Sequence, residues 1–493
     1  MNFSKKGVRM KTELENIFGE ENVKDDSEVL QRYSQDQSFV GPKMPQWVVF
    51  PKKVEQIQEM VKIANQNKIP IIPFSSGLNF HGATIPDQGG IILDMSKMNR
   101  VAEVNKRNWW VVIEPGVTYG QLQDELSSFG LRVMIPWGVP PTRSVLSSQM
   151  ERDPNLSYAS FEYGADRILD IEVILPEGEI YRTGGWGATD KPKGSFNLQH
   201  RFWTGAQGTL GIVSKLGLKL EYLPEDGKVF FLCFDRFEDA LAPLRMIQRK
   251  EIGLECFLLN NFNLAATVAQ DWEIPEIFPT KPKESKDFAK LRKSLPEWTM
   301  IVSLPAAPYF PEDKFAYEEE ALMKVGFDFN VEILNTIPGI NNLAAFFVSE
   351  LLRPWNILKK FNYRGSVHDV SFKSPLKKVP LFIDIIESMA KKHKYPLEDI
   401  GGYVLPIERG RASHCEFDFH CNLENEEEKK KVKKLWLETS RALIDAGAFF
   451  DRPYGPWAEM VFSRAGSYTE KLKELKKALD PNNIMNPGKL CFR

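Results

Sequence analysis

The stretch that most constrains the fold of this chain is Ile69–Gly82, which reads IPIIPFSSGLNFHG. Its apolar start ends at Pro73 and leads into Ser75-Ser76-Gly77, a pattern typical of a buried strand that opens into a loop. Gly77 permits positive φ and close backbone approach, so successive N–H groups of this loop could point into one concavity and hold a phosphate. The run Ile91–Asp94 follows two glycines and predicts a second strand. An ordinary tight turn between two strands is the alternative interpretation.

Composition limits the class of protein. The chain has 493 residues, enough for two or three domains of about 100–200 residues each. The formal net charge of −2 gives no basic field for nucleic acid or anionic lipid, so we expect neither as a partner. No apolar run reaches the roughly 18 residues that a membrane span needs, and the charged start of the chain does not resemble a signal peptide. Five scattered cysteines without a CxxC pair predict neither a zinc ribbon nor an iron–sulfur cluster, and they favour a cytoplasmic location.

Short strands and helices alternate along the first part of the chain. We expect residues 1–40 to form a polar, helical lead-in, followed by a strand over residues 46–50. A helix should begin at Pro51, because Val54, Ile57, Val61 and Ala64 then share one face. A further strand is expected over residues 110–114, and a helix from Thr118. This alternation predicts an α/β or α+β domain.

The segment of residues 136–165 is rich in proline, glycine and serine and predicts a long irregular loop. Such loops inside compact domains are usually functional, and this one carries Arg143, Glu151 and Arg152. Strands are predicted on either side of a turn at residues 176–178, and the segment GAQGTLGIV again joins glycines to a strand.

The sequence pattern changes after Pro224, where strand–helix alternations, proline-rich loops and many aromatic residues predict a second domain. Near the end of the chain, the spacing of Ser467 and Glu470 predicts a capping box at the start of a helix that ends at Leu479. Leu472, Leu475 and Leu479 would form its apolar face, and Asp480-Pro481 would stop it.

Six segments occur in a recognisable order: PFSSGLNFHG, GGIILDMSKMNRV, VVIEPGVTYGQL, VILPEGEIYRTGG, GAQGTLGIVSK and LDPNNIMNPGK. In this order they resemble the FAD-linked oxidases of the vanillyl-alcohol oxidase and p-cresol methylhydroxylase type. The resemblance implies an α+β fold with a lead-in at 1–40, a p-cresol methylhydroxylase-type FAD-binding domain at 41–225 and an α+β cap or substrate domain at 226–455. It also implies a C-terminal segment at 456–493 that returns to the flavin.

A dinucleotide pyrophosphate needs many N–H donors, because backbone amides can surround a broad anion. With the resemblance, this assigns the phosphate loop to the pyrophosphate; its residues are Ser75, Ser76, Gly77, Leu78 and Asn79, with Gly82 following. The resemblance implies that Pro140, Thr142 and Ser144 line the isoalloxazine and ribityl side. It places Gly211 and Ile212 on the adenine side, and Asn486 and Lys489 at the flavin from the C-terminal tail.

The resemblance also indicates catalytic residues. Glu151 stands where the family has an acidic residue near the reactive flavin nitrogen. Arg452 is retained from a Tyr-Arg pair that holds a phenolate, but Asp451 replaces the tyrosine. The phosphate loop is one residue shorter than in the family, so the second phenolate tyrosine is missing or replaced by His81. Both departures weaken the expectation of a para-substituted phenol as the substrate. A guanidinium suits a carboxylate or other oxyanion, so Arg452 is expected to anchor an oxyanion or a strongly polarised oxygen.

Several histidines leave alternatives open. His81 is a general base, a flavin contact or a structural residue. His368 lies in a stretch that roughly resembles a covalent flavin attachment site, but we expect FAD to be bound non-covalently. The alternation in HCEFDFH predicts that His414, Glu416, Asp418 and His420 share one strand face. That face could bind a divalent metal or could line a substrate cavity or solvent; we expect no metal.

The leading hypothesis for function is an FAD-dependent oxidase or dehydrogenase that takes a hydride from an alcohol, a hydroxylated substrate or an alkyl-aromatic substrate. The first alternative is a 2-hydroxy-acid dehydrogenase of the glycolate or D-lactate type. The second is a flavoprotein electron-transfer or scaffold subunit with a degenerate substrate site. The expected partners are a small organic substrate and an acceptor that is oxygen, a cytochrome or another flavoprotein. We also expect a homo-oligomer, in the simplest case a homodimer.

Overall fold

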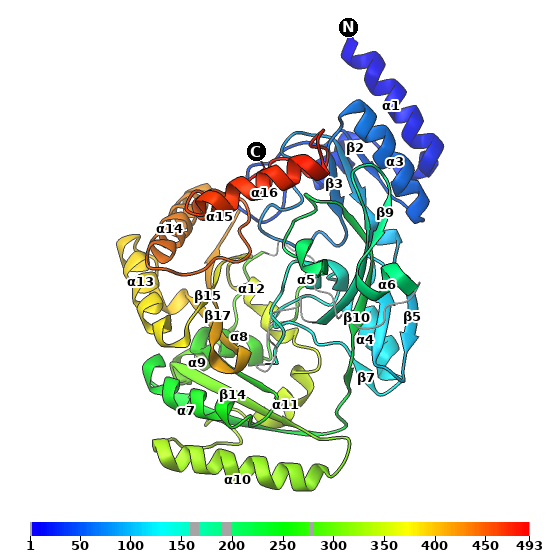
Figure 1. Cartoon of the computed structure of the whole chain (residues 1–493). Coiled ribbons are helices and arrows are strands. Elements are labelled where there is room, and N and C mark those ends of the chain that lie inside the picture. The colour runs from blue at the N-terminus through cyan, green and yellow to red at the C-terminus, as the bar shows by residue number, and fades with distance from the viewer. Residues whose placement is uncertain (1, 158–166, 190–198, 277–280, 493) are drawn as a thin grey trace.

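The computed structural model describes residues 2–157, 167–189, 199–276 and 281–492, with both ends of the chain visible in Figure 1. The predicted irregular loop at 136–165 therefore lies partly outside the described residues. Within this part of the chain, helices and strands alternate as the α+β prediction requires, and the strands form a four-stranded, a five-stranded, a two-stranded and a six-stranded sheet.

The first two sheets belong to the N-terminal half of the chain. The four-stranded sheet has the order β1 (Val23–Lys24), β2 (Trp47–Val49), β4 (Ile91–Asp94) and β3 (Ile71–Phe74). The five-stranded antiparallel sheet has the order β5 (Val101–Asn105), β6 (Trp110–Ile113), β10 (Ile212–Lys219), β8 (Ile168–Ile174) and β9 (Ile180–Arg182). A small ribbon pairs β7 (Leu131–Arg132) with β11 (Glu221–Tyr222).

Helices of the N-terminal half contribute apolar side chains to its hydrophobic core. They are α1 (Asn2–Phe18), α2 (Ser27–Arg32), α3 (Val54–Asn67), α4 (Tyr119–Ser127), α5 (Val145–Met150) and α6 (Gly184–Thr189). The predicted apolar face of α3 is buried against the parallel strands β3 and β4. The start at Pro51 was wrong, because the helix begins at Val54. Helix α1 is more than a lead-in, since Met10, Leu14 and Phe18 are buried in the same core.

The irregular-loop prediction was also wrong in part, because α5 lies inside that segment. Ser144 caps this helix by accepting a hydrogen bond from the Ser147 N–H.

The C-terminal tail returns to the first sheet, as predicted: Ile71 donates its N–H to Ile484, and Asn486 donates its N–H to Ile71. Strand β3 is thus held between β4 and the tail, and the loop that follows it has a fixed origin.

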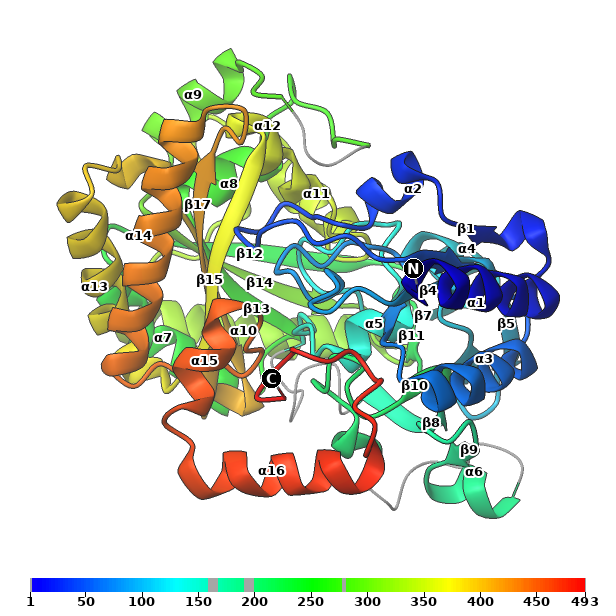
Figure 2. The same ribbon diagram turned by 90° about the horizontal axis from the view of Figure 1, so that it is seen from above.

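The six-stranded antiparallel sheet organises the second half. Its order is β12 (Gly227–Phe234), β14 (Trp298–Pro305), β13 (Glu255–Asn260), β16 (Gly401–Ile407), β17 (Ala412–Cys421) and β15 (Ser366–Ser374). Helices pack on both faces, as Figures 1 and 2 show; they are α7 (Phe237–Arg249), α8 (Asn261–Val268), α9 (Lys286–Ser294), α10 (Pro311–Phe329), α11 (Leu343–Glu350), α12 (Phe361–Arg364), α13 (Val379–Lys392) and α14 (Glu426–Asp445). Alternating residues of each strand therefore enter two separate cores.

Two helices follow before the tail, α15 (Pro456–Phe462) and α16 (Gly466–Leu479). The capping box was wrong, because α16 begins one residue earlier and no side chain caps it. Leu472 and Leu479 pack inward but Leu475 is exposed.

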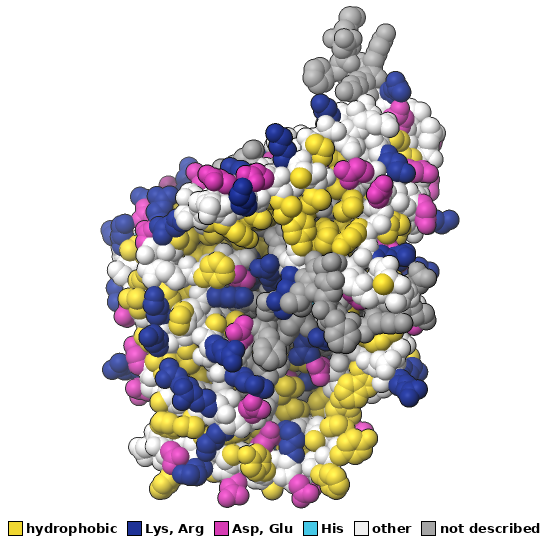
Figure 3. Space-filling model, viewed as in Figure 1, with side chains coloured by type: hydrophobic (Ala, Val, Ile, Leu, Met, Phe, Trp, Pro, Cys, Tyr) yellow, Lys and Arg dark blue, Asp and Glu magenta, His cyan; other side chains and the backbone are white. Residues whose placement is uncertain are grey.

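No helix in the described ranges is long and apolar enough to cross a membrane. On the face seen in Figure 3, basic and acidic side chains are scattered together, in keeping with the small net charge.

Candidate active site

The loop after β3 forms one wall of a pocket of about 850 Å³ between the first two sheets, which we call the dinucleotide pocket. All five residues from Ser75 to Asn79 line it. Gly77 has φ of 65°, and a Cβ at this position would lie 2.5 Å from the Phe74 ring. The loop therefore needs glycine here for its conformation and for the space under it.

The donors of this loop fit a phosphate group. The backbone amides of residues 76–79 have no hydrogen-bond acceptor among the described residues. The Ser76 hydroxyl is buried and likewise lacks a partner there. Buried polar groups are normally hydrogen-bonded, so these orphan donors are the signature of a site that an anion completes. The residues present thus fit the pyrophosphate of FAD.

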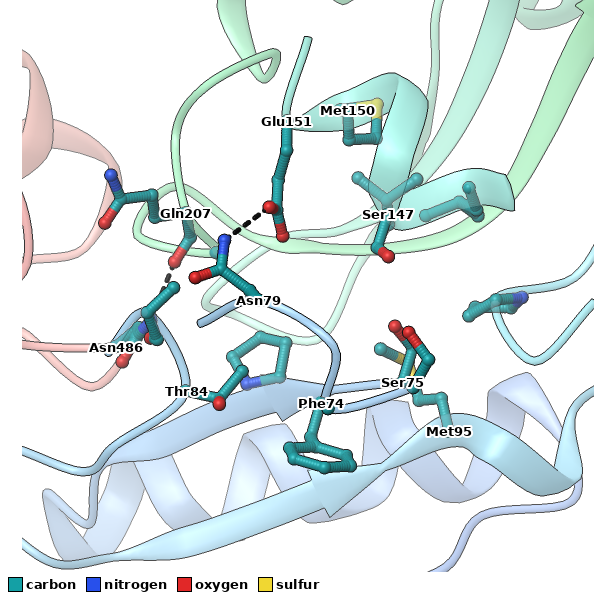
Figure 4. Close-up of a pocket in the computed structure, with 18 of the residues that line it drawn as sticks. Phe74, Ser75, Asn79, Thr84, Met95, Ser147, Met150, Glu151, Gln207 and Asn486 are labelled. Carbon is teal, nitrogen blue, oxygen red and sulfur yellow. Dashed lines mark hydrogen bonds between the residues drawn. The ribbon is translucent and has the colours of Figure 1, made fainter. Parts of the chain in front are cut away.

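The opposite wall comes from α5, from the GAQGTLG segment and from the tail. A Cβ on Gly208 would lie 2.9 Å from Pro73, and one on Gly211 would lie 2.7 Å from Val173, so both glycines keep this wall thin. Asn486 lines the pocket and donates to the Gln207 carbonyl at 2.7 Å, as Figure 4 shows. Gly211 and Asn486 thus line the pocket, and the parts of the cofactor that each would contact stay predictions.

Other predicted cofactor residues support the pocket without lining it. Lys489 donates to the carbonyls of Gly82 and Ile85 at 2.9 and 2.6 Å, so it clamps the chain that leaves the phosphate loop. Ile212 is fully buried in the core behind the wall. Ser144 caps α5 and donates to Pro115, whereas Thr142 is exposed. Pro140 lines a neighbouring pocket instead.

We call that neighbouring pocket, of about 910 Å³, the substrate pocket. It shares Leu78, Asn79, Arg143 and Glu151 with the dinucleotide pocket, so the two meet at these residues. The remaining lining comes equally from the two halves of the chain, and the second half contributes through strands β15 and β17 among others. Its aromatic lining residues are Phe80, Trp137, Phe361 and Tyr454, and its ionisable ones are His81, Arg143, Glu151, Asp153, Lys360, Asp369, Glu416, Asp418 and Arg452.

Glu151 lies where the two pockets meet. Its Oε2 accepts hydrogen bonds from Asn79 at 2.6 Å, Arg143 at 2.8 Å and Tyr454 at 3.0 Å. Oε1 has no hydrogen-bond partner among the described residues. Burial alone would raise the pKa of this carboxyl, but Arg143 and the other donors outweigh burial, so its pKa is lowered. Glu151 is therefore a fixed carboxylate with one oxygen available to a ligand; the alternative partner, Arg152, instead binds Thr204.

Arg452 is anchored at one end. Its Nη1 lies 2.5 Å from Asp153 Oδ1, and no further hydrogen bond of this guanidinium joins it to another described residue. Asp451 forms no ion pair with Arg452. Its carboxylate Oδ2 instead lies 3.6 Å from Lys373 Nζ. The charge of Arg452 is thus balanced by Asp153, while its other N–H groups remain available to a ligand oxygen.

His81 forms a pair with Asp369. The ring Nε2 lies 2.9 Å from Asp369 Oδ1, and the imidazole stacks on Tyr454 with 5.2 Å between centroids. Burial lowers the pKa of His81, but Asp369 more than compensates, so the pKa is raised. The carboxylate orients the imidazole and increases its basicity, which is the arrangement that a proton acceptor needs.

The predicted polar face of strand β17 lines the substrate pocket at Glu416 and Asp418, whereas His414 and His420 of the same face are buried and do not line it. Cys415, Phe417 and Phe419 of the alternate face enter the core under α13 and α14. Lys360 lies against the polar face, 2.8 Å from Asp418 and 3.3 Å from Glu416. The two carboxylates thus bind an ammonium group. Within the described residues no cluster of three histidine, cysteine or acidic side chains could hold a metal ion.

His368 lies in neither large pocket. It stacks on Phe39 at 4.0 Å and contacts the Ser366 hydroxyl at 3.0 Å, beside a smaller cavity of about 340 Å³. Burial lowers its pKa to about 3, so the ring is neutral. Sequence reasoning missed Tyr454, Asp153, Lys360 and Asp369. Only Tyr454 had a signal, since it stands two residues after Arg452.

Comparisons with known proteins fall on the same segments. The family described as "FAD binding domain" matches residues 45–184, and "FAD linked oxidases, C-terminal domain" matches residues 456–490. The glycolate oxidase subunit GlcD of Bacillus subtilis is 24% identical over 98% of this chain and 96% of its own length. The 4-cresol dehydrogenase [hydroxylating] flavoprotein subunit of Pseudomonas putida is 25% identical over 96% of this chain and 93% of its own. The solved structure of p-cresol methylhydroxylase covers 98% of this chain and 96% of its own with a TM-score of 0.83 at 21% identity.

The two family matches contain the phosphate loop, α5 and the returning tail, which build the dinucleotide pocket together with residues 203–213, outside both matches. Fold and site together define an FAD-dependent oxidoreductase. The chain belongs to the FAD-linked oxidases and has the fold of the p-cresol methylhydroxylase type. The expected domain boundaries, cytoplasmic location and homodimer stay predictions.

Proposed function

We propose that the protein oxidises an alcohol or alkyl-aromatic carbon held in the substrate pocket, with residues 41–225 as the FAD-binding domain and 226–455 as the cap. The observation that carries this proposal is the junction of the two pockets at Glu151, beside Tyr454 and Arg452. Aromatic lining residues at Trp137, Phe80 and Phe361 suit a flat apolar substrate body.

The side chains have distinct roles in this proposal. The available N–H groups of Arg452 hold the substrate oxygen. With Asp369 accepting from Nε2 of His81, the other ring nitrogen is free to take the hydroxyl proton. Bound FAD supplies the two-electron acceptor for the hydride that leaves the carbon, so an alcohol becomes a carbonyl compound. Glu151 keeps a negative charge at the pocket junction and orients the substrate through Oε1.

The charge distribution favours an alcohol or alkyl-aromatic substrate over a 2-hydroxy acid. A hydroxy acid carries a carboxylate, and each of Arg143, Lys360 and Arg452 is already paired with a carboxylate of the protein. The names of the relatives do not decide between these substrate classes, since one relative is named for cresol and another for glycolate. A scaffold subunit is disfavoured by a lined, polar pocket that adjoins the dinucleotide pocket.

The test is a screen for anaerobic reduction of the bound flavin with benzylic alcohols, alkylphenols and 2-hydroxy acids. Bleaching by a member of the first two groups, and turnover with an artificial acceptor, is expected. Bleaching by 2-hydroxy acids alone would contradict the proposal. We further propose non-covalent FAD, which the separation of His368 from the dinucleotide pocket supports. Acid precipitation should then release the colour, and colour that stays in the pellet until His368→Ala would overturn it.

A further inference from the structure

The lining of the substrate pocket is unbalanced in charge. Among its described residues, five carboxylates face three permanently charged bases and His81. Around Glu151 the charges cancel, because Arg143 and Arg452 match Glu151 and Asp153. The excess lies in the acidic cluster, defined as Asp369, Glu416 and Asp418 around Lys360.

The sheet register places this excess on neighbouring strands. In the antiparallel pair β15 and β17, Asp369 lies directly opposite Asp418, and Ser371 lies opposite Glu416. Like charges directly opposite each other destabilise a sheet, and buried charge is costly unless it is paired. Lys360 supplies one positive charge, while His81 beside Asp369 and His414, 3.5 Å from Glu416, supply further ones only when protonated.

The accessible surface of this cluster is acidic. The side chains of Glu416 and Asp369 are 23% and 19% exposed, whereas that of Lys360 is 8% exposed. A molecule that enters the pocket therefore meets the carboxylates before the ammonium. Asp418 is fully buried, and its Oδ1 has no hydrogen-bond partner among the described residues. An orphan buried acceptor on the pocket lining is an observation separate from the charge count, and it too indicates a missing donor.

We propose that the substrate carries a protonated amine, which binds at Glu416 and Asp369 while its oxidisable carbon lies at the pocket junction. This inference rests on the proposed function and narrows its substrate class to aromatic or alkyl alcohols with an ammonium group. Carboxylates that accept from an ammonium form charge-assisted hydrogen bonds, so the cluster sets specificity. A substrate carboxylate would be repelled from the same place.

The test measures binding apart from oxidation. FAD-loaded protein is titrated with benzylamine, benzyl alcohol and benzoate, and binding is followed by calorimetry and by the flavin absorption spectrum. Benzylamine is expected to bind at least tenfold more tightly than benzoate, with benzyl alcohol between them. Benzoate binding as tightly as benzylamine would overturn the inference, whatever the variants do.

Variants assign the effect to the cluster. Glu416→Gln should weaken benzylamine at least fivefold and leave benzyl alcohol within twofold, whereas Glu416→Asp, which keeps the charge, should retain most of the affinity. Glu320→Gln, at an exposed position of α10, is the matched control. Unchanged benzylamine affinity in folded, FAD-loaded Glu416→Gln would contradict the assignment.

Oxidation separates this inference from the function on which it rests. Anaerobic flavin reduction is compared for 4-(aminomethyl)benzyl alcohol and 4-methylbenzyl alcohol. At subsaturating concentration, at least tenfold faster reduction by the amine is expected. Equal rates would contradict the amine preference but leave the proposed function intact. No reduction by either alcohol, together with tight benzylamine binding, would contradict the proposed function and leave the binding inference standing.

Discussion

The two pockets that meet at Glu151 are built on opposite principles. The dinucleotide pocket consists of glycines, backbone amides and neutral side chains, and among the described residues its only charged lining groups are Arg143 and Glu151, which it shares. The substrate pocket is lined by charged side chains that form ion pairs across segments far apart in the chain, such as Arg452 with Asp153 and His81 with Asp369. The first pocket fits a group that brings its own charge, and the second presents charge to a ligand.

This difference predicts how each pocket fails. A pocket of backbone donors depends on chain conformation, so a single methyl group in the wrong place should abolish binding. A pocket of paired side chains depends on charge balance, so its variants should change affinity and rate in steps.

The largest effect is expected for Gly77→Ala, which should lose most of the FAD. The new Cβ would lie 2.5 Å from the Phe74 ring at a φ of 65°, so either that ring or the phosphate loop must move and the backbone is strained. The matched control is Gly130→Ala, because Gly130 has φ of 67° but no atom within 4 Å of such a Cβ. The ratio of flavin to protein absorbance measures the outcome. Equal FAD content in both variants would show that the loop conformation does not govern binding.

The same contrast explains what the sequence could predict. The phosphate loop is one contiguous strand-to-glycine segment, so the local pattern predicted a loop able to hold a phosphate, and the family resemblance assigned Ser75–Asn79 to the pyrophosphate. The apolar faces of α3 and α4 were predictable for the same reason. Lys360 and Asp369 could not be found, because their role arises from a network that only folding assembles, whereas Tyr454 had a signal in its place two residues after Arg452. Thr142 and Ser144 were assigned from the family resemblance, whereas in the structure Ser144 caps helix α5.

The next effect concerns Arg452 in the substrate pocket. Arg452→Ala should weaken substrate binding by roughly 2–4 kcal/mol, because it removes a buried, charge-assisted contact. The half-saturating substrate concentration should rise accordingly. Arg452→Lys should raise it less, because the charge remains. Flavin bleaching across a substrate concentration series measures both.

The control for Arg452 is its partner. Removing the guanidinium leaves buried Asp153 with only the longer contact to Arg143, at 3.6 Å, among the described residues, which by itself destabilises the fold. Arg452→Ala combined with Asp153→Asn should restore thermal stability but not substrate affinity. Recovery of affinity in the double variant would reduce Arg452 to a structural ion pair.

A smaller effect is expected at the junction of the pockets. Glu151→Gln should slow flavin reduction at least tenfold, about 1.4 kcal/mol in the barrier, while FAD is retained. The amide still accepts from Asn79 and Tyr454 but no longer carries the charge that faces Arg143. Stopped-flow reduction under anaerobic conditions gives the rate. An unchanged rate would assign Glu151 to the support of the loop.

The smallest effect is a pH dependence confined to the charged pocket. Burial and the neighbouring Glu416 raise the pKa of Asp418 to about 6, although Lys360 opposes them. Because this folded-state pKa is above the ordinary value for aspartate, the folded protein holds the proton that the unfolded chain has released, and Asp418 makes the fold less stable as pH rises through about 4 to 6. The same ionisation adds negative charge to the acidic cluster, so benzylamine, which stays protonated, should bind a few fold more tightly at pH 7 than at pH 5. FAD content should not change, since the dinucleotide pocket contains no group that titrates there. Asp418→Asn should flatten both the melting-temperature profile and the benzylamine profile, and a variant with the slope of the wild type would place the titrating group elsewhere.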